Sequence, residues 1–157
     1  MARWLSTAQP EALFVLSAVA QYIGAAIAVL LFDQVEPQNV AWFRIIGASI
    51  ALLAVSRGWR SGWTRPQLIS VAVFGITTAL MNICFYLAID RIDLGKGVTI
   101  EFIGPITVAA IATRSIRNGV ALAFAIVGVV VLGGVEVADN LDGLFFILLA
   151  SALWAGY

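Results

Sequence analysis

The sequence predicts an all-α membrane protein with five transmembrane helices followed by the start of a sixth. Three observations support this fold class: 62% of the 157 residues are hydrophobic, only 11% are charged, and the mean hydropathy is +1.01. So much apolar surface exceeds what the core of a small soluble protein can bury. The apolar residues also gather in long runs separated by short polar turns, which is the pattern of membrane-spanning helices.

The first three runs cover about residues 12–32, 38–56 and 66–89. Each is long enough to cross a hydrocarbon core of about 30 Å at a rise of about 1.5 Å per residue. Pro66 stands in the first turn of the third run, where its missing N–H costs no hydrogen bond. We therefore predict three spans joined by short connections.

The fourth run, residues 94–113, contains the pair Gly104-Pro105. We predict that Pro105 kinks this helix, because proline leaves a backbone carbonyl without its donor and membrane helices tolerate this beside a neighbour or a cavity. A sixth run begins at Leu144 and reaches Tyr157 before it is long enough to span comfortably. We interpret the chain as one that has been cut.

The fifth run, residues 118–135, is rich in small residues. Ala121, Ala125 and Gly128 stand at positions i, i+4 and i+7 of this run and so share one helix face. A strip of small residues lets the backbone of another helix approach closely. We therefore predict that the fifth span is a packing helix.

The charges in the turns predict the orientation. With the N-terminus inside, the inner segments hold six basic residues and the outer turns hold two. Positively charged residues concentrate on the cytoplasmic side of membrane proteins. We therefore expect a cytoplasmic N-terminus.

Three polar residues within different spans are predicted to lie at one depth. Arg44, Asn82 and Glu101 each stand six or seven residues from the outer end of their run, which places them about 9 to 11 Å below the outer boundary. An ionised group near the centre of a membrane helix costs about 2.5 to 3.5 kcal/mol, so a charge without a role is unexpected. Either Arg44 and Glu101 form an ion pair that ties two spans together, or they also line a hydrated pocket, which is the interpretation we favour.

Such a pocket would suit a small zwitterion, for example an amino acid. An ionised Glu101 can hold a substrate amine and Arg44 can hold a carboxylate; a neutral Glu101 can instead bind and release a proton during transport. Tyr86, one helical turn above Asn82, is either the outer lip of the pocket or an aromatic anchor at the membrane interface. Gln21 and Tyr22, in the middle of the first run, either face the pocket or bond to a neighbouring helix.

Other classes of function find little support. The chain has no histidine and a single cysteine, Cys84, so neither a metal site nor a disulfide framework nor a cofactor is predicted. Nine basic and nine acidic residues cancel, which gives no reason to expect nucleic acid as a partner. The sequence offers neither paired acids nor a nucleophile with its base, so an enzyme is not expected. The main alternative to a transporter is a membrane helix bundle that does not transport, either an assembly subunit or an inactive truncated product.

An internal repeat supports the interpretation of a cut chain. Residues 12–24 can be set over residues 144–156, and five of the thirteen positions are identical, with Tyr22 opposite Trp154. The offset of 132 residues corresponds to one unit of five spans. An odd number of spans inverts the second copy, which is the plan of many secondary carriers.

Four short segments resemble the EamA-type drug/metabolite transporters, and most closely their threonine/homoserine exporter branch. The segments are Met81-Asn82, Phe85-Tyr86-Leu87-Ala88, Gly97-Val98 and Glu101-Phe102-x-Gly104-Pro105. The resemblance implies a bacterial inner-membrane protein of ten helices in two inverted repeats, which exports amino acids or related small metabolites.

The same resemblance implies how this chain is divided and what it associates with. Residues 1–139 would form the first five-helix repeat, and residues 140–157 would begin the second. By analogy with the family, the substrate cavity lies between the halves, with Asn82, Tyr86, Glu101 and Pro105 in the matching segments. The expected partners are the lipid bilayer, a small-molecule substrate, and either the missing second repeat or a second copy of the chain.

Overall fold

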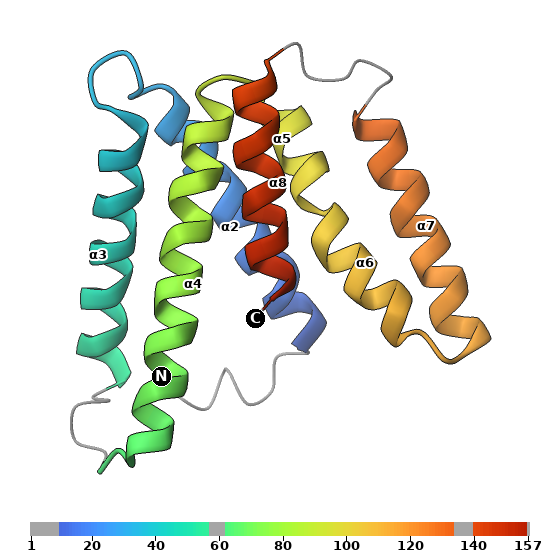
Figure 1. Cartoon of the computed structure of the whole chain (residues 1–157), viewed down its shortest axis with the longest axis horizontal. Coiled ribbons are helices and arrows are strands. Elements are labelled where there is room, and N and C mark those ends of the chain that lie inside the picture. The colour runs from blue at the N-terminus through green and yellow to red at the C-terminus, as the bar shows by residue number, and fades with distance from the viewer. Residues whose placement is uncertain (1–9, 57–61, 134–139, 157) are drawn as a thin grey trace.

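The computed structural model describes residues 10–56, 62–133 and 140–156, and all regular structure in these ranges is helical (Figure 1). The predicted all-α class is therefore confirmed for this part of the chain. The helices are α2 (Pro10–Val29), α3 (Pro37–Ser56), α4 (Arg65–Ile89), α5 (Leu94–Glu101), α6 (Ile103–Ala112), α7 (Ile116–Gly133) and α8 (Leu141–Ala155). Successive helices alternate in direction, except that α6 continues the course of α5 (Figure 1).

The ends of the predicted runs lie within about four residues of the ends of the helices, wherever the structure describes those ends. The last two residues of the predicted fifth run, 134 and 135, lie outside the described residues, as do the ends of the predicted repeat, 1–9 and 134–139. The fourth run is divided into α5 and α6 at Phe102. Pro66 stands in the first turn of α4, as predicted.

The outer surface of the bundle is apolar, as expected for a membrane protein. Helices α3, α4 and the pair α5 with α6 are long and apolar enough to cross a membrane, and α2, α7 and α8 contribute shorter apolar segments. Large hydrophobic side chains point outward, among them Val55, Ile111 and Phe124, which are 86%, 80% and 74% exposed. In water such a surface would be strongly unfavourable, whereas lipid chains solvate it.

Two turns at the same end of the bundle are fixed by helix caps (Figure 1). The Asp93 carboxylate accepts a hydrogen bond of 2.9 Å from the N–H of Gly95 at the start of α5. The Asn140 side chain accepts bonds of 3.0 and 3.1 Å from Asp142 and Gly143 at the start of α8. Because these side chains satisfy N–H groups that have no partner within the helix, they define where α5 and α8 begin.

Helix α8 lies at the centre of the packing, against α4, α5 and α6 (Figure 1). Two glycines permit this close approach. A Cβ atom on Gly143 of α8 would lie 2.7 Å from the side chain of Ile92, and one on Gly97 of α5 would lie 2.9 Å from Ile89. The side chain of Ile147, fully buried on α8, lies 3.9 Å from the position that a Cβ atom on Gly97 would take. Helix α3 packs on α4, and α7 packs on α5 and α6.

Candidate functional site

The interruption between α5 and α6 positions the polar residues of the candidate site. Pro105 has no N–H, so the carbonyl of Glu101, four residues earlier, lacks its intrahelical donor. The helix is interrupted at Phe102, three residues before Pro105, which is the turn that a proline disturbs. The N–H of Gly104 donates a hydrogen bond of 2.8 Å to Oγ of Ser151 on α8. The interrupted helix is thus held by a side chain from a neighbouring helix.

Glu101, the last residue of α5, is 2% exposed. Its carboxyl group interacts electrostatically with Arg44 on α3 and with Tyr22 on α2. Within the described part of the chain, neither a hydrogen bond nor an ion pair reaches this carboxyl group. Glu101 therefore faces the interior of the bundle, and its oxygen atoms keep their capacity to bind another group.

Arg44 contacts Tyr86 directly. Its Nη1 donates a hydrogen bond of 2.7 Å to the Tyr86 hydroxyl, and its guanidinium carbon lies 5.8 Å from the centre of the same ring. Charge-assisted hydrogen bonds and cation–π contacts are both strengthened where water is excluded. This contact joins α3 to α4. Arg44 and Glu101 do not form the direct ion pair considered from the sequence, because the guanidinium turns to the tyrosine instead.

Tyr86 is completely buried. Its ring packs edge to face against Phe32 and Phe85, with centroids 6.0 and 5.8 Å away. An aromatic anchor at the membrane interface would be partly exposed, so that alternative for Tyr86 is wrong. The buried hydroxyl finds in Arg44 the hydrogen-bond partner that a buried tyrosine needs.

Asn82 is the third residue of the predicted polar layer. Its Nδ2 donates a hydrogen bond of 2.9 Å to the backbone carbonyl of Thr78, one turn earlier in α4. The hydroxyl of Thr78 is buried and has no hydrogen-bond partner. The structure therefore gives Asn82 a local contact within its own helix and none to Arg44 or Glu101.

Gln21 and Tyr22 line a small cavity of about 120 Å³ between α2 and the junction of α5 with α6. Its other lining residues are Ser17, Ala18, Phe102 and Trp154. The ring of Phe102 lies between two aromatic neighbours: its centroid is 6.4 Å from that of Tyr22 and 5.2 Å from that of Trp154. Sequence reasoning did not select Phe102 or Trp154 as site residues. The signal for Trp154 was its position opposite Tyr22 in the internal repeat.

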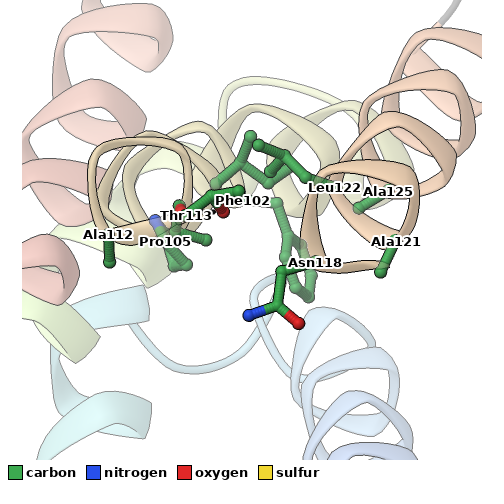
Figure 2. Close-up of a pocket in the computed structure, with 10 residues that line it drawn as sticks. Phe102, Pro105, Ala112, Thr113, Asn118, Ala121, Leu122 and Ala125 are labelled. Carbon is green, nitrogen blue, oxygen red and sulfur yellow. Dashed lines mark hydrogen bonds between the residues drawn. The ribbon is translucent and has the colours of Figure 1, made fainter. Parts of the chain in front are cut away.

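A larger cavity of about 520 Å³ separates α6 from α7 (Figure 2). The predicted strip of small residues does not bring a helix close here. Ala121 and Ala125 line this cavity, and a Cβ atom on Gly128 would meet nothing within 4 Å. The small side chains of Ala121 and Ala125 leave this space unfilled, while α7 as a whole packs on α5 and α6. Asn118 is the amide among its lining residues (Figure 2).

Comparisons with known proteins relate the chain to a group of exporters. It is 32% identical over 137 residues to the threonine/homoserine exporter RhtA of Escherichia coli (strain K12), and 31% identical over the same length to RhtA of Salmonella typhimurium (strain LT2). The match covers 85% of this chain but 46% of each exporter, so the chain spans about half the length of these relatives. No family model and no solved structure matches the chain.

Proposed function

This chain is related by sequence to the threonine/homoserine exporters of the EamA-type family, over about half their length, and we propose that it is the N-terminal half of a secondary transporter that exports small amino acids. In this proposal residues 1–139 form a five-helix repeat and residues 140–157 begin the inverted second repeat. The protein lies in the bacterial inner membrane with its N-terminus in the cytoplasm, and it is not an enzyme.

The observation that carries the proposal is a buried carboxyl group with free acceptor atoms, near an arginine on another helix. Glu101 is 2% exposed and receives no hydrogen bond from the described residues, while Arg44 interacts with it through space. Inside a membrane a charged residue is costly, and such residues mark the paths of ions and solutes. A pair that served only as a structural tie would be expected to make direct contact.

The arrangement suits a zwitterion. The ammonium group of an amino acid would bind the Glu101 carboxylate, and its carboxylate would bind guanidinium donors of Arg44 that the Tyr86 hydroxyl does not occupy. Each charged group of the solute would then lose its bound water and contact a side chain of opposite charge instead. Water exclusion strengthens both interactions. Asn82, Gln21 and Tyr22 are proposed to contribute polar contacts around this pair.

The proposed partner is a second five-helix repeat, supplied either by further sequence of the same gene product or by a second copy of the chain. The relatives are about twice as long as the matched region. In carriers with inverted repeats, the substrate site lies at the interface between the repeats near the middle of the membrane. Beside Glu101, α5 passes into α6 at a turn that contains Pro105, and Phe102 keeps helical dihedral angles there. Membrane helices tolerate such a proline beside a neighbouring helix or a cavity.

A transport assay tests this function. The full product of the gene would be reconstituted into lipid vesicles, and the exchange of labelled threonine and homoserine would be measured for the wild type and for Glu101→Gln. Loss of a charge-assisted bond worth about 1.5 to 3 kcal/mol would lower transport efficiency by roughly 10-fold to 150-fold. Phe124→Leu, an outward-facing change on α7, is the matched control and should leave transport unchanged.

Two results would oppose the proposal in different ways. Glu101→Gln with wild-type flux would show that the carboxylate does not bind the solute. A correctly folded wild type that moves no amino acid would favour the alternative, a membrane helix bundle that serves as an assembly subunit.

A further inference from the structure

The small cavity beside Glu101 has aromatic walls. Phe102 forms one wall between the rings of Tyr22 and Trp154, at centroid distances of 6.4 and 5.2 Å. Ser17, Ala18 and Gln21 of α2 complete the lining, and the side chains of Ser17 and Gln21 are themselves exposed. The cavity therefore offers mainly apolar contact to a guest.

This cavity and the carboxyl group of Glu101 are neighbours. Phe102 follows Glu101 in the chain at the helix interruption, and Tyr22 both lines the cavity and interacts electrostatically with Glu101. A solute whose ammonium group is bound by Glu101 would therefore have the cavity within reach of its side chain. The opposite charge of Glu101 would hold the ammonium end of such a solute, and the shape of the cavity would limit the size of its side chain.

The volume of the cavity limits what can enter. About 120 Å³ is well below the roughly 300 to 1,000 Å³ of pockets that enclose drug-sized ligands. The indole of Trp154 is the largest side chain in the lining, and it packs edge to face against Phe102. Side chains that are short, either aliphatic or carrying one hydroxyl group, match this space, whereas aromatic side chains exceed it.

We propose that this cavity is the subsite for the substrate side chain and that Trp154 sets the upper size limit of the amino acids exported. The inference rests on the proposed transport function and adds a specificity determinant to it. It assigns a role to α8, the helix at the centre of the packing, because α8 carries Trp154. Removal of the indole should admit longer side chains without preventing binding of the ammonium group.

The test is a competition experiment on the reconstituted full gene product. Unlabelled alanine, threonine, valine, leucine and phenylalanine would compete with labelled threonine in the wild type, Trp154→Phe and Trp154→Ala. A pocket that accepts or rejects one additional methylene group discriminates between two substrates by roughly 10-fold or more. Trp154→Ala should therefore improve competition by leucine and phenylalanine relative to threonine by about 10-fold, and Trp154→Phe should give an intermediate shift.

Two further variants guard against a result due to misfolding. Trp42→Ala removes an indole from α3 that is 49% exposed on the outer surface, and it should leave the order of competitors unchanged. Ala18→Val narrows the cavity from α2 without removing a contact, and it should weaken competition by valine and leucine more than by alanine.

The outcomes separate this inference from the proposed function. If the wild type transports no amino acid, the proposed function fails. If the wild type transports threonine but neither the active Trp154 variants nor Ala18→Val change the order of competitors, the subsite is disproved while the transport function stands.

Discussion

At the scale of single residues, the contact between Arg44 and Tyr86 shows how the bundle accommodates a charged side chain within a membrane span. A guanidinium within a membrane span needs a partner, and the tyrosine hydroxyl 2.7 Å away provides one while its ring provides a second contact. The geometry leaves other N–H donors of Arg44 available. A residue can therefore be structurally satisfied and still able to bind a solute.

Tyr86→Phe removes the hydroxyl acceptor but keeps the ring. Because the donor of Arg44 would lose a charge-assisted bond, we expect the free energy of unfolding to fall by about 1.5 to 3 kcal/mol, as measured by denaturant titration in detergent. A double-mutant cycle with Arg44→Met isolates the pair. A coupling energy near zero would mean that the hydrogen bond does not contribute to stability.

At the scale of helices, α6 and α8 cross closely at Gly104 and Ser151. Among the glycines that the structure describes, Gly104 leaves the least room for a side chain. A Cβ atom on Gly104 would collide with the backbone of Ser151, and the Gly104 N–H is bonded to the side chain of that same residue. Backbone atoms cannot rotate away as a flexible side chain can. The contact thus holds the interrupted helix, and with it Glu101, against the centre of the bundle.

Gly104→Ala should therefore be severely destabilising, with a loss of about 3 kcal/mol or more and a marked fall in the melting temperature of the purified protein. Gly128→Ala is the matched control on α7, where an added Cβ would meet nothing within 4 Å and alanine is the better helix former. Equal melting temperatures for the two variants would refute the close crossing.

The hydrophobic runs predicted the helices, but not the rotation of each helix about its own axis. Hydrophobic runs locate a span, and a fixed rise per residue locates Arg44 and Glu101 along it. Which face a residue occupies depends on which helix packs beside it. Thr78, Asn82 and Tyr86 share one face of α4, but their spacing does not say which neighbouring helix lies against that face. The pairing of Arg44 with Tyr86 and the position of Trp154 beside Phe102 depend on that packing and were missed.

At the scale of the molecule, the orientation in the membrane is a separate prediction. The excess of basic residues in three segments, 1–11, 57–65 and 114–117, predicts that these segments face the cytoplasm and that residues 33–37 face outward. Alkaline phosphatase fused after residue 34 should be active, because this enzyme folds only outside the cytoplasm, whereas fusions after residues 63 and 114 should be inactive. The reverse pattern would invert the bundle and place Glu101 nearer the cytoplasmic side.

The central claim is that Glu101 faces a hydrated path that an amino acid occupies, and the reactivity of a cysteine at this position tests it most directly. In the full gene product freed of its native cysteines, including Cys84, Glu101→Cys should react with a charged, water-soluble thiol reagent, and Phe124→Cys on the outer surface should not. Because Glu101→Cys removes the proposed ammonium contact, threonine should be supplied at saturating concentration, and it should slow the reaction several-fold through its remaining contacts. A cysteine at position 101 that is as unreactive as one at position 124, or one whose labelling no amino acid slows, would contradict the account.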